Sequence, residues 1–324
     1  MHILVIGAAG MIGRKLVAAL IAGGELRGRP IEELTLADIV APEMPKFGGK
    51  VETVAADLSD QGVAAKLVAT RPDLIFHLAA IVSGEAEVDF EKGYRVNMDG
   101  TRALFEAIRL EGLKAPYAPK VVFTSSIVVY GEPLPETIED TYFLTPLTSY
   151  GTQKAIGELL LADYSRRGFL DGIGLRLPTI CIRPGAPNRA ASGFFSNILR
   201  EPLVGEEAIL PVPETVRHWF ASPRSAVGCC LRAATIDTEL IGPRRTLSMP
   251  GLSATVGEQI DALRRAAGEQ AVRLIRREPD PRIMEMIDGW APALDASRAE
   301  RLGFAAETSF DEIIRVHLED ELHR

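Results

Sequence analysis

The chain has 324 residues, of which 47% are hydrophobic and 25% are charged, and its net charge is −8. This composition is typical of a globular protein, and the length is sufficient for two domains. The negative charge argues against a general nucleic-acid binder, and no apolar run approaches the length of a membrane span, which excludes an integral membrane protein.

The cysteines indicate a reducing compartment. Cys181, Cys229 and the adjacent Cys230 make an odd count, which does not suit a disulfide framework. The N-terminal apolar stretch lacks a charged n-region, so we expect no secretion signal. We therefore expect a cytoplasmic protein, with all three cysteines acting as small buried apolar residues.

A glycine turn follows the first apolar run of the chain. Residues 2–6 predict a buried strand, Gly7, Gly10 and Gly13 follow it, and an amphipathic helix comes next. In a dinucleotide site, such glycines allow the tight turn, the approach of the pyrophosphate and close packing of the helix. The spacing is G-x-x-G-x-x-G, and an ordinary turn is the alternative. We expect the turn, with Met11 and Ile12, to bind a dinucleotide.

An acidic residue ends the second predicted strand, at residues 34–38. At this place the carboxylate of Asp38 can accept hydrogen bonds from the adenosine ribose hydroxyls, and it repels a 2′-phosphate. We therefore expect NAD rather than NADP, although Arg14 and Lys15 offer positive charge nearby. The alternative is that Asp38 only caps a turn.

Two further predicted strands lead into cofactor contacts. Residues 51–55 are followed by Asp57 and Leu58, which either border the adenine or, for Asp57, cap the next helix. Residues 73–77 are followed by Leu78, Ala79 and Ala80, whose small side chains leave room for a cofactor at the carboxyl end of the strand.

A serine and a Tyr-x-x-x-Lys pair follow the fifth predicted strand, at residues 120–124. Tyr150 and Lys154 share one face of a helix, and a nearby ammonium lowers the pKa of a phenol. Such a tyrosine can exchange a proton with an alcohol or carbonyl oxygen. The proline-containing loop before Tyr150 allows Ser126 to converge on it and to donate a hydrogen bond where charge develops. Separately, each feature is also compatible with a solvated pair or a serine turn.

Residues 86–112 predict a long helix that contains Asn97. Asn97 is either a surface residue or the holder of a water beside Lys154. Apolar residues on more than one face of this helix and of the helix at 150–167 leave apolar surface for association, and we expect a homodimer, the commonest closed symmetry. The residues concerned are Leu104, Ile108, Leu159 and Leu160.

The alternation of strand and helix loosens after a sixth predicted strand at residues 174–178. Residues 181–216 are expected to form a substrate loop, and residues from about 244 a second region with a strand at 247–249. The pattern predicts an α/β fold with a Rossmann-type doubly wound parallel sheet and a smaller C-terminal substrate domain. The expected ranges are 1–180 with a return segment at 217–243 for the NAD-binding domain, and 181–216 with 244–324 for the substrate-binding domain.

These motifs together resemble the extended short-chain dehydrogenase/reductase family, also described as NAD-dependent epimerases and dehydratases. The glycine pattern, Asp38, Ser126, Tyr150 and Lys154 occur in the order and spacing of that family. Further matches are Val129-Tyr130-Gly131, Asp295-Ala296-Ser297 and Leu302-Gly303-Phe304. The sugar-nucleotide dehydratases of this family carry Thr, Asp and Glu where this chain has Ser126, Ile127 and Val128, which disfavours elimination chemistry.

The resemblance implies a role for each matching residue. We expect no metal site. The implied catalytic set is Ser126, Tyr150 and Lys154, with Asn97 completing a proton relay. The expected cofactor contacts are Gly7, Gly10, Met11, Ile12, Gly13, Asp38, Asp57, Leu58, Leu78, Ala79, Ala80, Asn97, Tyr150, Lys154, Leu177 and Thr179. The expected substrate contacts are Ser83, Ser126, Tyr150, Arg183 and Arg217.

The implied activity is NAD-dependent oxidation of a small hydroxylated acid. Segments 177–180 and 217–220 resemble those of members that act on four-carbon sugar acids, which implies D-erythronate as substrate, oxidised beside its carboxylate. Arg183, Arg189 or Arg217 would clamp the carboxylate, and the sequence does not choose among them. The alternatives are a nucleotide-sugar 4-epimerase with tightly bound NAD and a non-catalytic NAD-binding redox sensor.

Overall fold

The computed structural model describes residues 1–185 and 192–323, which divide into two compact units. The first unit contains Met1–Ser126, Thr148–Arg176 and Val227–Leu247, and the second contains Ile127–Leu147, Leu177–Ala226 and Ser248–Arg324. The predicted return segment at 217–243 is therefore divided between the units, and residues 127–147 and 177–180 of the predicted range 1–180 lie in the second unit. The assignment of one unit to NAD and the other to substrate stays a prediction.

The first unit is built on a seven-stranded sheet. Its strands are β1 (His2–Ile6), β4 (Glu33–Asp38), β5 (Lys50–Ala55), β6 (Leu74–His77), β7 (Lys120–Ser126), β9 (Asp171–Leu177) and β13 (Thr246–Ser248). They lie in the order β5-β4-β1-β6-β7-β9-β13, and β5, β4, β1, β6 and β7 pair in parallel. The order reverses direction between β1 and β6, which is where doubly wound sheets bind dinucleotides. The α/β doubly wound prediction is confirmed. The prediction that places residues 247–249 in the second region is wrong for Leu247, because β13 joins this sheet.

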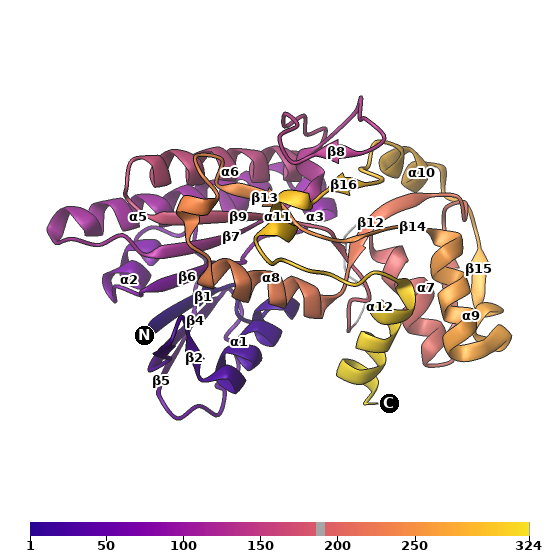
Figure 1. Ribbon diagram of the computed structural model, residues 1–324, viewed down its shortest axis with the longest axis horizontal. Coiled ribbons are helices and arrows are strands. Elements are labelled where there is room, and N and C mark those ends of the chain that lie inside the picture. Colours follow the sequence, from indigo (N-terminus) through magenta and orange to yellow (C-terminus); the bar gives the residue numbers. More distant parts are fainter. Residues whose placement is uncertain (186–191, 324) are drawn as a thin grey trace. The chain divides into compact units, whose positions relative to one another are not determined.

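Helices cover both faces of this sheet (Figure 1). They are α1 (Met11–Gly23), α2 (Val63–Ala69), α5 (Gly100–Lys114), α6 (Ser149–Arg166) and α8 (Pro223–Thr235), with α2, α5 and α6 on one face and α1 and α8 on the other. A short hairpin of β2 (Glu25–Leu26) and β3 (Arg29–Pro30) follows α1, and a 3₁₀ turn (Thr238–Leu240) follows α8.

Apolar residues of α5 and α6 are divided between core and surface. Leu104 and Ile108 are fully buried in the core beneath α2, α5 and α6, so the prediction that they face a subunit interface is wrong. The exposed apolar residues of the two helices are Leu110, Leu113 and Leu159, which is 66% exposed.

The predicted long helix at 86–112 is interrupted. The structure has α3 (Ser83–Val88), α4 (Phe90–Gly93), a π-helical segment (Tyr94–Asp99) and then α5. Asp89 leaves the helical region with φ −120° and ψ 84°, and its side chain accepts a hydrogen bond from the backbone N–H of Lys92. Asp89 therefore ends one helix and caps the next, as short acidic side chains commonly do.

The second unit contains short sheets and several helices. Its strands are β8 (Ile138–Glu139), β10 (Thr179–Ile180), β11 (Ala208–Leu210), β12 (Arg217–Ala221), β14 (Leu252–Thr255), β15 (Ile275–Arg277) and β16 (Leu294–Asp295). Its helices are α7 (Gly193–Leu203), α9 (Val256–Val272), α10 (Pro281–Asp288), α11 (Ser297–Arg301) and α12 (Phe310–His317), with a 3₁₀ turn (Ile127–Val129) and a π-helical end (Leu318–Leu322). The predicted substrate loop at 181–216 is wrong for α7 and β11, because Phe194, Phe195, Ile198 and Leu199 bury an apolar helix face in the core of this unit.

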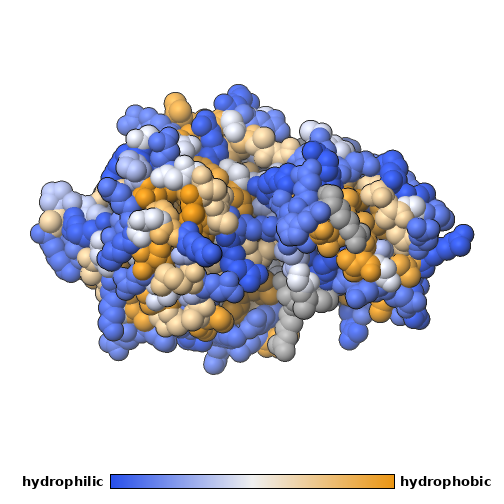
Figure 2. Space-filling model, turned by 90° about the horizontal axis from the view of Figure 1, so that it is seen from below, coloured by the Kyte–Doolittle hydropathy of each residue, from blue (hydrophilic) through white to orange (hydrophobic). Residues whose placement is uncertain are grey.

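The surface shows apolar residues in separate patches among hydrophilic ones (Figure 2). Within residues 1–185 and 192–323, no helix is long and apolar enough to cross a membrane. All three cysteines are buried, as expected from the sequence, and within the described residues none of them forms a disulfide.

Candidate active site

The glycine turn after β1 depends on two glycines. Gly7 has φ +93°, and a Cβ on it would lie 2.7 Å from the backbone nitrogen of Ala79. A Cβ on Gly13 would lie 2.1 Å from the carbonyl oxygen of Gly7, so only glycine lets α1 pack this closely on the turn. Gly10 precedes α1, and no side chain caps the helix N terminus in the described structure. The first N–H groups of α1 are thus available to an anion.

Asp38 lies beside this turn. Its Oδ2 accepts a hydrogen bond of 2.9 Å from the N–H of Ala9, within the turn, and its Oδ1 accepts one of 3.4 Å from Val40. The carboxylate is partly exposed. It therefore stands next to the place where the turn would hold a pyrophosphate, with lone pairs left for a ribose.

The segment after β6 lies against the same turn. The N–H groups of Leu78 and Ala79 donate to the carbonyl oxygen of Ile6, and residues 78–80 are partly exposed. Ser83 begins α3 a few residues later. Small side chains at the carboxyl ends of β1 and β6 thus border the switch point of the sheet, as a dinucleotide site requires.

The structure gives Asp57 and Leu58 local roles. Asp57 accepts hydrogen bonds from the N–H and hydroxyl of Ser59, at 2.9 and 2.6 Å, and from Arg95 at 2.8 Å. The N-cap residue of α2 is Gly62, so the alternative that Asp57 caps that helix is wrong. Leu58 is buried in the core. Contact of either residue with adenine stays a prediction.

Tyr150 lies in the first turn of α6 and Lys154 one turn later, on one helix as predicted. The side chain of Thr148 caps this helix by accepting the N–H of Gly151 at 3.0 Å. The Nζ of Lys154 lies 5.7 Å from the ring centroid of Tyr150 and 2.8 Å from the carbonyl oxygen of Thr124. Because Lys154 is only 3% exposed, burial lowers its pKa to about 8, and the nearby Glu158 carboxylate opposes that shift.

Ser126 is the last residue of β7, against which α6 packs. Lys154 bonds the carbonyl of Thr124, two residues before Ser126, so the end of the strand is tied to the helix that carries Tyr150. Ser126 and Tyr150 are both partly exposed. The first unit thus brings a hydroxyl, a phenol and an ammonium onto two adjoining elements.

Asn97 is 2% exposed, so the surface alternative is wrong. Its Oδ1 accepts the N–H of Ile81 at 2.9 Å, and its Nδ2 donates to the carbonyl of Ile81 at 3.2 Å and to Oε1 of Gln153 at 2.8 Å. Both N–H groups of the carboxamide are therefore used within the protein. Asn97 connects the segment after β6 to the catalytic helix, and a role in a proton relay stays a prediction. Sequence reasoning missed Gln153, although it lies inside the Tyr-x-x-x-Lys segment.

The remaining predicted residues belong to the second unit. The hydroxyl of Thr179 lies 2.7 Å from Nε2 of His218, which is buried. The guanidinium of Arg183 donates to the carbonyl of Ile180 and to the hydroxyl of Ser192, at 3.0 and 2.7 Å. Leu177 follows the first unit directly at the end of β9. Arg189 lies outside the described residues.

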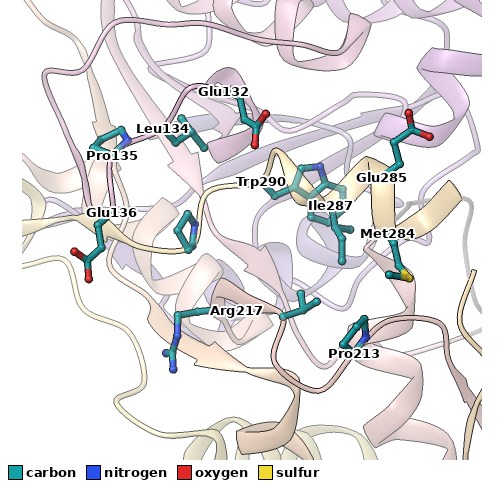
Figure 3. A pocket seen from close by; sticks show the side chains of 12 residues that line it. Glu132, Leu134, Pro135, Glu136, Pro213, Arg217, Met284, Glu285, Ile287 and Trp290 are labelled. Carbon is teal, nitrogen blue, oxygen red and sulfur yellow. The ribbon is translucent and has the colours of Figure 1, made fainter. Parts of the chain in front are cut away.

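Arg217 lines a pocket of about 630 Å³ in the second unit (Figure 3). Its guanidinium donates to the carbonyl of Ser253 at 3.1 Å and lies 3.4 Å from the Glu258 carboxylate. Its side chain is 43% exposed. The pocket has an apolar side, formed in part by Trp290, Ile287 and Met284, and three glutamates at Glu132, Glu136 and Glu285.

The residues of the first unit suit a dinucleotide and acid–base chemistry. The turn with Gly7 and Gly13 presents backbone N–H groups to a pyrophosphate, and Asp38 is placed to accept from ribose hydroxyls. Tyr150, with the Lys154 ammonium 5.7 Å from its ring centroid, supplies the phenol and the neighbouring charge that proton exchange with a substrate oxygen would require.

Comparisons with known proteins agree with this geometry. Residues 3–226 match the NAD dependent epimerase/dehydratase family. The chain is 47% identical to a D-erythronate dehydrogenase of Cupriavidus necator, covering 99% of this chain and 98% of that protein. It is 38% identical to a D-erythronate dehydrogenase of Haemophilus influenzae, over 99% of this chain and all of that protein.

A solved structure is also similar over the whole chain. It is a crystal structure described as a nucleoside-diphosphate-sugar epimerase from Agrobacterium tumefaciens, 68% identical, with a TM-score of 0.98. The alignment covers 100% of this chain and 95% of that one. The match over residues 3–226 and the similarity to full-length relatives show that the chain belongs to the NAD dependent epimerase/dehydratase family.

Proposed function

We propose that this protein catalyses the NAD-dependent oxidation of D-erythronate to 2-oxo-D-erythronate. The observation that carries the proposal is the 47% identity to a D-erythronate dehydrogenase along nearly all of both chains. The juxtaposition of Tyr150 and Lys154 at the start of α6, beside the end of β7, supports a dehydrogenase. The chemistry removes a proton from a hydroxyl and a hydride from the carbon that bears it.

The cofactor would be held by the first unit. The N–H groups at the start of α1 would bind the pyrophosphate, Asp38 the adenosine ribose, and Ala79 and Ala80 would border the nicotinamide half. When bound, NAD supplies the hydride acceptor. Because the Asp38 carboxylate would repel a 2′-phosphate, we expect preference for NAD over NADP.

The protein's own residues would manage the proton and the charge. Tyr150 accepts the hydroxyl proton of the substrate, and the Lys154 ammonium stabilises the phenolate that makes this possible. Ser126 donates a hydrogen bond to the reacting oxygen, and Asn97 fixes the segment after β6 through Ile81. In the second unit, Arg217 is the candidate clamp for the carboxylate, because it lines the pocket with a side chain that is 43% exposed, whereas Arg183 bonds Ile180 and Ser192.

The alternative is a nucleotide-sugar 4-epimerase, in line with the description of the Agrobacterium structure. The residues that line the pocket around Arg217 argue against the epimerase, because they do not suit the diphosphate of a nucleotide sugar. Glu132, Glu136 and Glu285 line that pocket, and Arg217 already lies 3.4 Å from Glu258. These carboxylates repel any anionic ligand, but they repel a diphosphate, which carries more than one negative charge, more strongly than the single carboxylate of a sugar acid. A purely NAD-binding redox sensor would not need Tyr150 and Lys154 together.

The test is the formation of NADH from NAD with purified protein and a panel of sugar acids, with UDP-sugars as the comparison. Net NADH release with D-erythronate is the expected result. Tyr150→Phe keeps the ring but removes the proton acceptor, so we expect kcat to fall by roughly 10²–10⁴-fold with NAD affinity largely kept. Interconversion of UDP-sugars with no net NADH would favour the epimerase, and near-native turnover by Tyr150→Phe would refute the assigned base.

We propose a cytoplasmic homodimer that serves sugar-acid catabolism. The exposed Leu110, Leu113 and Leu159 on α5 and α6 support pairing through these helices, since large apolar side chains on a helix surface favour association. Light scattering at micromolar concentration tests the assembly, and a monomer there would contradict it.

A further inference from the structure

A buried ion pair lies one helical turn beyond Lys154. Glu158 on α6 is 4% exposed and Arg176 at the end of β9 is 7% exposed. The guanidinium Nε of Arg176 donates to both carboxylate oxygens of Glu158, at 3.0 and 3.1 Å, and its Nη2 donates to Oε2 at 2.7 Å. Such geometry fixes the carboxylate in the plane of the guanidinium, which a single contact would not do.

The same carboxylate also holds the catalytic strand. The hydroxyl of Ser125 donates to Oε1 of Glu158 at 2.5 Å. The backbone of β7 is thus tied to α6 at the residue directly before Ser126. Together with the bond from Lys154 to the carbonyl of Thr124, this gives the end of β7 two polar contacts with α6, at the two residues that precede Ser126.

We propose that Glu158 is a positioning residue of the active site, whose carboxylate, fixed by Arg176, holds Ser125 against α6 and keeps a negative charge beside Lys154. The inference rests on the proposed dehydrogenase function of Ser126, Tyr150 and Lys154. The ion pair of Glu158 and Arg176 would then set the distance between β7, which carries Ser126, and α6, which carries Tyr150.

The charges around Lys154 agree with this task. Glu158 lies four residues later on the same helix face. From β6, His77 faces Lys154 as a neutral ring, because burial lowers its pKa to about 3, and Tyr150 faces it from the preceding turn. Burial disfavours the ammonium form of Lys154, and the Glu158 carboxylate is the group that favours it. Loss of the Glu158 carboxylate should therefore lower the pKa of Lys154.

The first experiment removes the serine contact without breaking the ion pair. Ser125→Ala deletes the hydrogen bond to Glu158, and Ser165→Ala is the matched control, because Ser165 is a buried serine near the far end of the same helix that bonds Leu161 and Gly172. We expect Ser125→Ala to lower kcat by roughly 10-fold or more with NAD affinity unchanged, as for a misplaced catalytic group, and Ser165→Ala to leave kcat unchanged. Equal kcat for Ser125→Ala and wild type would overturn the inference.

The second experiment reads the protonation of Lys154 and requires no substrate. Protein labelled with ¹³C in the lysine side chains is titrated by NMR, and Lys154→Met assigns the signal. We expect the Lys154 pKa to fall in Glu158→Gln and also in the neutral double variant Glu158→Gln/Arg176→Gln, which avoids leaving the Arg176 charge unpaired. An unchanged titration in the folded variants would overturn the electrostatic part. If D-erythronate is not oxidised and the titration still shifts, the proposed substrate fails while the role of Glu158 stands.

Discussion

Replacing Lys154 by methionine removes a charge that folding buries in the first unit. Lys154 is 3% exposed, and burial lowers its pKa from 10.5 to about 8. Between these two pH values the unfolded chain binds the proton and the folded protein does not, so stability rises with pH across the interval. The cost of the buried ammonium is therefore fully present below about pH 8, and it disappears as the pH rises through about 10.5.

The size of the effect follows from the interval. A pKa difference of about 2.5 corresponds to about 3 kcal/mol of unfolding free energy. Between about pH 7 and about pH 9.5, this pH dependence amounts to about 2 kcal/mol of unfolding free energy. Wild type should therefore gain about 2 kcal/mol of stability relative to Lys154→Met over this pH range. The variant has no group to titrate at this position, and the other titrating residues cancel in the comparison.

The assay is urea unfolding of wild type and variant at both pH values. Lys46→Met is the control, because Lys46 is exposed and its charge stays in water in the folded protein. We expect the difference between wild type and Lys154→Met to change by about 2 kcal/mol and the difference for Lys46→Met to stay constant. A difference for Lys154→Met that does not vary with pH would show that the ammonium is not desolvated in the folded state.

The remaining predictions concern the cofactor and the assembly. Gly13→Ala would place a Cβ 2.1 Å from the Gly7 carbonyl oxygen, so we expect α1 to shift and NAD affinity to fall in calorimetry, and unchanged affinity would contradict the close packing. Asp38→Ala should narrow the preference for NAD over NADP measured as kcat/KM, whereas a native enzyme that uses both equally would contradict the role of Asp38. Leu159→Glu should convert the proposed dimer to a monomer in light scattering, because it places a charge on an exposed apolar helix face; a variant that stays dimeric would move the interface elsewhere.

Much of the first unit is encoded locally. The strands β1, β4 and β6 are continuous or nearly continuous apolar runs because both faces of a parallel sheet are covered, so each is recognised without knowledge of its neighbours. The glycine turn is local as well, since Gly7 needs a positive φ and Gly13 packs on a residue six positions earlier. Tyr150 and Lys154 share a face by helix periodicity alone.

Two of the predictions that failed did so for different reasons, one local and one set by distant parts of the chain. Asp89 interrupts the predicted long helix because its side chain caps the next helical segment. The spacing of apolar residues alone does not predict this interruption. Residues 193–203 read as a loop because of their flanking Pro, Gly and Arg, although α7 buries one apolar face in the second unit.

The sequence by itself determined the doubly wound sheet, the glycine turn and the pairing of Tyr150 with Lys154, because each depends on residues a few positions apart. Only the tertiary structure decided that Asn97 is buried against Ile81 and Gln153, 16 and 56 positions away. It alone joined Glu158 to Ser125 and Arg176, 33 and 18 positions distant. A buried polar group must find its partner wherever the fold places one, and no local periodicity records that choice.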